Sequence, residues 1–428
     1  MRTQVLLPAS KRGRQCGAVI VTTALVLLFL LGFSAIALDF GHLFVVKTEL
    51  QNAMDSCALS AAQELDGRED ALVRATNAGI AAGNLNRVDF QSVNWRGRPM
   101  VTGDDISFRD AAYLPTAVPA DARYAQCQHT QPGVQLWLLQ AMGAFSGATA
   151  SYPNAQNVFA LAVATRSSAQ TTCPIPLALK PKPGSAAPDY GFEVGEWVTL
   201  LMQQNAAQGG QIGWANLDGS NNAAQTAAEL EGSCGTRVGD TLGTPGVQTS
   251  IADVWNYRFG IYKNTGDPAV NRPDFTGYAY TSNNWPSRRS AYDGTPGPGA
   301  HATAQNFVTK RLAYASCADT GTRVRGANSC ESITGLSLNS FQNLAAPGNS
   351  TGGHRDYGSN RRLATVPVVN GANQVIDYAC MLLLQPLSIP MTNVELEYRG
   401  NAGDPGSPCT TNGLPGGTAG PLVPVLVE

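Results

Sequence analysis

The sequence predicts an α+β fold in which a long N-terminal helix precedes a small α+β module and a β-rich domain with long loops. Residues 17–38 carry no charge, and an amphipathic helical pattern continues to residue 65 without a proline. Strand-length apolar runs bounded by Gly, Pro, Asn or Asp follow along much of the remaining chain. We therefore expect three segments, at residues 1–65, 66–172 and 173–428.

The uncharged run is long enough to cross a membrane. As a helix, residues 17–38 span about 33 Å, which is close to the thickness of the hydrocarbon core of a bilayer. Lys11, Arg12 and Arg14 precede the run, and Asp39 follows it. Because basic flanks remain in the cytoplasm, the sequence predicts a single-pass protein whose N-terminus lies inside and whose chain beyond Asp39 lies outside.

The amphipathic continuation predicts a packing surface. Apolar side chains recur at steps of three and four residues on one face, at Leu43, Val46, Leu50, Met54, Cys57, Ala58, Ala61 and Leu65. Asp66-Gly67 is typical of a helix stop. We expect one continuous helix, half in lipid and half in water, that packs against neighbouring subunits. A glutamate at Leu50 or Ala58 is then expected to disrupt assembly and to leave membrane insertion intact.

The same helix carries a motif. A basic residue, Gly-Ala, an apolar run, Asp-x-Gly and an LQNA-type stretch follow one another, with matching residues at Arg14, Gly17, Ala18, Asp39, Gly41, Leu50, Gln51, Asn52, Ala53, Asp55, Ala58, Leu59 and Ala61. This segment resembles the N-terminus of TadE/TadG-like Flp (tight adherence) pilus-assembly proteins. The resemblance covers residues 14–65. It implies a TadG-type protein of the bacterial inner membrane, a minor pilin or accessory protein with a periplasmic C-terminal domain. Its partners would be lipid and other pilus-assembly or pilin-like subunits, and it could associate with the pilus.

Two features bear on whether the N-terminus is cleaved. Thr22 stands five residues after Gly17, where pilin-like relatives that are cut by a prepilin peptidase carry Glu, and Cys16 interrupts the arginine–glycine junction. Ala35 and Ala37, in contrast, fit a small-residue signal-cleavage site. A generic signal anchor therefore stays open, as does a secreted or surface adhesin that binds an external ligand through residues 173–428.

The outer chain consists of short expected elements separated by turns. Helices are expected at 68–82 and 133–145, and strands at 88–95, 106–113, 122–128, 158–165, 196–201, 211–217, 259–262, 363–369, 380–389, 393–398 and 422–427. The Pro-, Gly- and Lys-rich stretch 180–188 predicts a linker or boundary, and the aromatic-rich stretch 255–292 predicts loops. A long helix followed by a small sheet is the plan of a pilin, so the resemblance implies a pilin-like module at 66–172.

The cysteines predict an oxidising compartment. Cys16 precedes the apolar run and the other eight cysteines follow it. An even number outside the membrane favours disulfides, and the expected pairs are Cys317 with Cys330 and Cys380 with Cys409. The sequence leaves the connectivity open, and Cys57 also fits a small buried residue on a helix.

Composition and motifs argue against catalysis and nucleic-acid binding. The net charge is -2, so the chain has no basic excess for binding nucleic acid. The sequence has no H-E-x-x-H motif, which would favour a periplasmic hydrolase, and no P-loop motif, which would favour a nucleotide-binding protein. His42 is expected at the membrane interface and His354 in a solvated loop. Asp218 to Asn222 resemble a metal-dependent adhesion loop, although an Asp-Gly turn explains them. We expect no enzyme activity, metal or cofactor.

Overall fold

The computed structural model describes residues 18–88, 101–138, 155–202, 209–244, 249–263, 267–299, 304–317, 324, 330–338, 341, 343–344 and 350–427. The chain forms two compact units. The first unit comprises residues 1–64, 72–164 and 426–428, and the second comprises residues 65–71 and 165–425. Helices and strands occur in both units, as expected for the α+β class.

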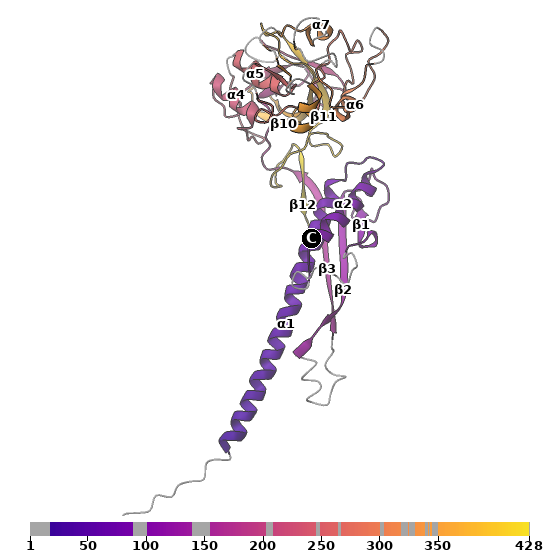
Figure 1. Ribbon diagram of the computed structural model, residues 1–428, viewed down its shortest axis with the longest axis vertical. Coiled ribbons are helices and arrows are strands. Elements are labelled where there is room, and N and C mark those ends of the chain that lie inside the picture. The colour runs from indigo at the N-terminus through magenta and orange to yellow at the C-terminus, as the bar shows by residue number, and fades with distance from the viewer. Residues whose placement is uncertain are drawn as a thin grey trace, which may run out of the picture. The chain divides into compact units, whose positions relative to one another are not determined.

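The first unit is organised around α1 (Ala18–Gln63), a helix of 46 residues that Figure 1 draws in indigo and purple. It runs without a break from the uncharged residues into the amphipathic stretch, because no proline interrupts it. The chain leaves the helix through a turn at Glu64 and reaches Gly67, whose φ of 79° suits a residue without a Cβ. The helix therefore ends within one turn of the Asp66-Gly67 stop that the sequence predicts.

A second helix and an antiparallel sheet complete this unit. The elements are α2 (Ala71–Leu85), the 3₁₀ turn η1 (Gly103–Asp105), β1 (Ile106–Arg109), β2 (Tyr124–Gln135) and most of β3 (Ala155–Ser168). The sheet also includes β12 (Leu422–Leu426), of which Leu426 alone falls in this unit. The strand order is β1-β2-β3-β12. In the long β2–β3 pair Cys127 lies opposite Ala162, and the register shifts between Gln131 and Val134. Pro132 and Gly133 lie at this shift, because proline lacks the N–H that a regular ladder requires.

The helix expected at 133–145 is wrong in its described N-terminal part. Residues 133–135 continue β2, whereas Trp137 and Leu138 are helical as expected, and residues 139–145 lie outside the described residues. Pairing with β3 outweighs the short helical pattern here, since local propensity is a weak determinant beside a partner strand. The strand expected at 88–95 lies outside the described residues, except for Val88. The last expected strand, at 422–427, forms β12.

The second unit is built on a closed barrel with the strand order β10-β11-β5-β6-β4-β9. The strands are β4 (Leu177–Leu179), β5 (Trp197–Leu200), β6 (Ile212–Trp214), β9 (Leu363–Val369), β10 (Val375–Leu383) and β11 (Val394–Asn401). The β5–β6 and β4–β9 neighbours are parallel, whereas the other neighbours are antiparallel. Closure leaves these strands without a free edge. The expected β-rich character of the C-terminal part is therefore present as a barrel.

Two hydrophobic clusters cover the two faces of β10. Met381 and Leu383 belong to the large core cluster with Trp255 and Phe259. Their neighbour Leu382 belongs to a second cluster, together with residues from the stretch 278–307. The aromatic-rich stretch expected as loops therefore lacks long regular structure, yet it contributes fully buried rings such as Tyr280 and Trp285. Burial on both faces explains why β10 is apolar at consecutive positions.

Short helices of the second unit escape prediction from the sequence. They are α4 (Ala223–Glu231), α5 (Thr249–Tyr257), α6 (Phe307–Leu312), α7 (Cys330–Thr334) and α8 (Ser350–Tyr357), beside the antiparallel pair β7 (Ile261–Tyr262) and β8 (Asn343–Leu344). Each of these helices has nine residues or fewer, which is too short to display helical periodicity clearly. Tertiary contacts stabilise such helices, since isolated ones would melt in water.

The stretch 180–188 is not a domain boundary. It connects β4 to β5 within the second unit and is bonded to that unit, because Lys180 N donates to the Gln211 carbonyl at 3.1 Å and Lys182 N donates to the Tyr190 carbonyl at 3.1 Å. Pro and Gly indicate turns, and turns occur inside domains as well as between them. The second unit instead takes up the chain again at residue 165, ahead of the expected boundary at 173, and the first unit combines the whole of α1 with most of the expected 66–172 module.

A buried polar cluster joins the barrel to its loops. The Asp274 carboxylate is fully buried and accepts hydrogen bonds from the backbone N–H groups of Arg361 and Arg362, at 2.8 and 2.9 Å. The Asp274 carbonyl lies 2.9 Å from Nδ1 of His354, which is fully buried on α8. The expected solvated position of His354 is therefore wrong. Burial lowers the pKa of His354, because the charged imidazolium would lose its hydration.

Acidification should destabilise the second unit through His354. The unfolded imidazole binds a proton near its usual pKa of about 6.5, whereas the folded one resists, so the free energy of unfolding falls by up to about 1.4 kcal/mol per pH unit below that value. The fall ends at the lowered folded pKa. Glu229 and Glu397 act in the opposite sense, because burial raises their pKa values.

Comparison with His354→Asn isolates the histidine, since an amide N–H can replace the Nδ1 donor while the side chain no longer titrates. We expect denaturation curves of the wild type and the variant to diverge between pH 7 and pH 5, with the wild type losing more stability. Parallel pH dependences would show that His354 is not buried in its neutral form.

Candidate functional site

The first half of α1 presents an apolar surface. Its large side chains are exposed within the chain, for example Leu28 at 67% and Phe29 at 75%. Among the described helices, α1 has the length and apolar composition of a membrane span. The hydroxyls of Thr22 and Thr23 donate to the Val19 carbonyl at 3.0 and 2.7 Å, so these polar groups are satisfied inside the helix. Lipid requires such internal satisfaction.

The predicted packing face of α1 is buried within its own chain. Its members Val46, Leu50, Met54, Cys57, Ala58 and Ala61 are 0% exposed, Leu65 is 4% exposed and Leu43 is half-buried. Strand β2 contacts the helix along this half. The face is therefore already occupied in the isolated chain.

A disulfide fixes this contact. Cys57 of α1 is bonded to Cys127 of β2, with a Cα–Cα distance of 6.1 Å. Cys57 is therefore more than a small buried residue. The second unit contains the bonds Cys173–Cys234, Cys317–Cys330 and Cys380–Cys409, which include both pairs that the sequence suggested.

Two glycines let α2 approach α1 closely. A Cβ at Gly79 would lie 3.2 Å from Sγ of Cys57, and a Cβ at Gly83 would lie 2.5 Å from Cγ2 of Val101. Any larger side chain at Gly83 would therefore force the helices or the strand connection apart. Sequence reasoning missed this role, because isolated glycines in a helical pattern normally signal lower helix propensity.

The polar motif residues bind the same sheet. Gln51 Nε2 donates to the Leu161 carbonyl of β3 at 2.7 Å and to the Asp55 carboxylate at 2.9 Å. Ala53 is fully buried, while Asn52 lines a surface recess of about 290 Å³ near the end of α2. At Gly41 an added Cβ would meet nothing within 4 Å. Ala18 begins α1, and Gly17 lies outside the described residues.

Asp39 and His42 mark the place where the apolar run ends. The Asp39 carboxylate is 1% exposed and accepts a hydrogen bond from the backbone N–H of Leu138 at 3.0 Å. The His42 ring is 5% exposed and stacks on the Trp137 ring, with centroids 4.8 Å apart and planes 11° apart. The side chains of Asp39 and His42 therefore both contact the residues that follow β2.

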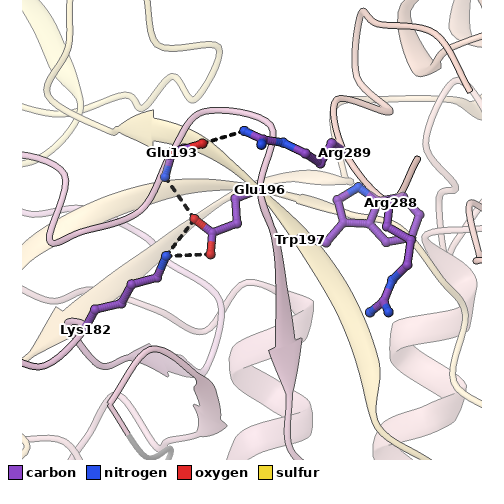
Figure 2. Close-up of a pocket in the computed structure, with 6 residues that line it drawn as sticks. All are labelled: Lys182, Glu193, Glu196, Trp197, Arg288 and Arg289. Carbon is purple, nitrogen blue, oxygen red and sulfur yellow. Dashed lines mark hydrogen bonds and ion pairs between the residues drawn. The ribbon is translucent and has the colours of Figure 1, made fainter. Parts of the chain in front are cut away.

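The second unit has a cavity of about 450 Å³ lined by charged side chains (Figure 2). Lys182 Nζ lies 2.6 Å from the Glu196 carboxylate, and Arg289 lies 2.6 Å from that of Glu193. Arg288 pairs with Glu395. Each lining cation thus has a carboxylate partner, and the cavity has no dominant charge that would select an anion or a cation.

Trp197 lines this cavity, and a hydrogen bond to a buried carboxylate fixes its indole ring. Its Nε1 donates to the Glu397 carboxylate at 3.3 Å, and the same carboxylate accepts from Ala291 N and from Arg399. Glu397 is 0% exposed, and burial raises its pKa. Because backbone and side-chain donors already occupy it, this carboxylate serves the structure of the wall.

The remaining candidates for chemistry have structural partners. The Asp218 carboxylate accepts from Ser220 N at 2.9 Å, and Asn222 caps α4 by accepting from Ala224 N, so the stretch is a turn followed by a helix start. His129 lies 3.1 Å from the Asp105 carboxylate. His301 lies outside the described residues. Within the described ranges, no group of three or more His, Cys, Asp or Glu side chains is placed to hold a metal.

One sequence pattern calls for comparison with a nucleophile elbow. Gly348, Ser350 and Gly352 form G-x-S-x-G, the pattern of a serine that sits between a strand and a helix. Residues 345–349 lie outside the described part, and α8 begins at Ser350. The nearest histidine in sequence, His354, is fully buried, and its Nδ1 lies 2.9 Å from the Asp274 carbonyl.

Comparisons with known proteins identify the helix. Residues 17–64 match the Tad family of Flp pilus-assembly TadE/G-like proteins. No curated protein and no solved structure matches the chain. The match confirms the resemblance that the motif shows, and it coincides with α1, which runs from Ala18 to Gln63. It indicates a part in Flp pilus assembly and, together with the apolar helix, a membrane-anchored protein.

Burial of Leu50 makes a testable distinction between intramolecular and intermolecular packing. Leu50→Glu should lower the free energy of unfolding of the first unit by more than about 3 kcal/mol, because it removes a buried side chain and introduces an unpaired charge. Thr48→Glu, at an exposed position of the same helix, is the matched control and should change it by less than about 0.5 kcal/mol. Denaturation of the detergent-solubilised proteins, monitored by limited proteolysis, measures the change in the free energy of unfolding for both variants.

Equal stability of the two variants would contradict the intramolecular contact and would return Leu50 to packing between subunits.

Proposed function

We propose that this chain is a TadG-type minor pilin or accessory protein of the tight-adherence pilus, anchored in the bacterial inner membrane by α1. One observation supports this most directly: the family match, residues 17–64, and a single unbroken helix, Ala18–Gln63, cover the same segment. The matched segment is thus a helix with one half suited to lipid and the other half folded into its own domain.

The orientation in this proposal places the N-terminus in the cytoplasm. Lys11, Arg12 and Arg14 precede the span, and basic flanks remain inside. The four disulfides beyond the span support a periplasmic location for the rest of the chain, since disulfides persist in oxidising compartments. The first unit is then a pilin-like module, and the barrel unit is the part presented to the periplasm.

Contacts with other pilus subunits are assigned here to the membrane half of α1. One face of the amphipathic half is buried against β2 and α2 of the same chain, whereas the side chains from Val19 to Leu31 are largely exposed. Small residues such as Gly32 and Ser34 permit close approach of a second helix in lipid, where packing rather than the hydrophobic effect drives association. The function proposed is structural, without a catalytic step.

Gly32→Leu tests this assignment. The added side chain should separate α1 from a partner helix, so co-purification with other pilus subunits should fall several-fold, while resistance to carbonate extraction from membranes stays unchanged. Leu28→Ile serves as a volume-conserving control on the same span and should retain co-purification. Undiminished co-purification of the Gly32 variant would remove the membrane half as the assembly surface.

Fractionation separates the two forms of the proposal. A minor pilin should appear in sheared, purified pili, detected with an antibody against the barrel unit, whereas an accessory protein should remain entirely with the inner membrane. Absence from both pili and membranes that hold pilus-assembly proteins would contradict each form.

The second candidate function is a surface adhesin, and the cavity beside Trp197 is the observation that favours it. Release from the membrane would require cleavage near Ala37, within the helix. N-terminal sequencing of the mature protein decides between them. The anchored protein should begin ahead of residue 18, whereas a first residue just beyond Ala37 would support the adhesin.

A further inference from the structure

We propose that Trp137 and Leu138, at the end of β2, form a second contact with the membrane surface beside α1. The partner is the boundary between lipid headgroups and acyl chains. The inference uses the membrane anchor and does not depend on a role in the pilus. The inference rests on the position at which the fold holds these two residues, on the exposed fraction of their side chains and on the lack of charged residues in the surrounding sequence.

The first step is position. The backbone N–H of Leu138 is bonded to Asp39, which directly follows the uncharged run, and the Trp137 ring is stacked on His42. These two contacts hold the end of β2 at the level of residues 39–42 of α1. Sequence separation between the partners is close to one hundred residues, so the tertiary fold, and not chain proximity, places an aromatic residue there.

The second step is depth. His42 lies four residues beyond Leu38, which corresponds to about 6 Å along a helix. The polar layer on each side of a bilayer is roughly 5–7 Å thick. Trp137 therefore lies at headgroup level when residues 17–38 span the hydrocarbon, and this is the level at which tryptophan is enriched in membrane proteins.

The third step is exposure. Trp137 is 59% exposed although one face of its ring is stacked on His42, and Leu138 is 37% exposed because only its backbone N–H is bonded to Asp39. Phe40 and Phe44 of the neighbouring helix turns are 50% and 69% exposed. These four apolar side chains beyond the uncharged run would face water in the absence of lipid, which is costly for a soluble surface and favourable at a bilayer.

The fourth step is charge. From Thr130 to Thr165 the sequence contains no Asp, Glu, Lys, Arg or His. The nearby carboxylate of Asp39 is buried, and the next basic residue along α1, Lys47, donates to the Phe159 carbonyl at 2.5 Å. A stretch of sequence without charged side chains can approach lipid without desolvating an ion, and it has no basic group with which to prefer anionic headgroups.

Fluorescence quenching of the full-length protein in vesicles tests the contact. The chain has 6 tryptophans, so the emission of Trp137 is taken as the difference between the wild type and Trp137→Phe. Phosphatidylcholine vesicles carry a nitroxide either near the glycerol backbone or near the end of the acyl chain. We expect the label near the glycerol backbone to remove most of the Trp137 emission and the deep label to remove much less. Adding phosphatidylglycerol should leave this pattern unchanged.

Trp197→Phe is the matched control, because Trp197 lies among charged side chains, which disfavour contact with lipid; its difference emission should resist both labels. Circular dichroism verifies that each variant folds. Trp137 emission that neither label quenches overturns the proposal. So does emission that becomes shielded from aqueous iodide only after other pilus subunits are added, since that result would assign the surface to a protein partner.

Discussion

The packing of α1 against the sheet of its own unit is the interaction on which the first unit depends. The two halves of the helix suit different environments. The first half is apolar on its outer surface, as lipid requires, whereas the second half has one apolar face that must be shielded from water. The sheet removes that face from water through fully buried residues such as Leu50, Met54 and Ala61. Gln51 adds a hydrogen bond to the Leu161 carbonyl of β3. The motif that identifies the family therefore has an intramolecular meaning, since its residues make the helix part of a folded domain.

In the second unit, buried polar contacts help to stabilise a barrel of short strands connected by long loops. Arg362 is the clearest example. Its guanidinium donates to the carbonyls of Leu383 and Tyr278 and lies 4.3 Å from the centre of the Phe259 ring. Burial lowers the pKa of Arg362 to about 10, which leaves it charged at neutral pH. A buried cation is tolerated here because carbonyls and an aromatic face replace its water.

Long-period features were visible in the sequence, and short or three-dimensional ones were not. The continuous helix followed from uninterrupted apolar spacing, and strand β9 coincides with the expected 363–369. In contrast, α4 to α8 are too short to show a period, and barrel closure depends on pairings such as that between Leu179 and Val368 that no local pattern encodes. The candidate site could be predicted only in part from the sequence, for the same reason. Spacing identified the buried face of α1, but whether its partner was another subunit or β2 depended on tertiary structure. His354 shows the converse, since its polar neighbours in sequence suggested solvent whereas Asp274 holds it in the core.

The Cys57–Cys127 bond has a mechanical consequence. It joins the amphipathic half of α1 to the N-terminal part of β2 by a covalent link. A pull along the helix axis, such as extraction from a bilayer would exert, cannot slide the helix past the sheet by giving up apolar contacts one at a time. The load passes through the sulfur atoms into β2 and from there into the hydrogen-bonded ladder with β3, which resists in shear with many bonds at once. Oxidation thereby makes the helix and its sheet one covalently linked body that shares an applied force, whereas reduction would leave two packed elements that can separate contact by contact.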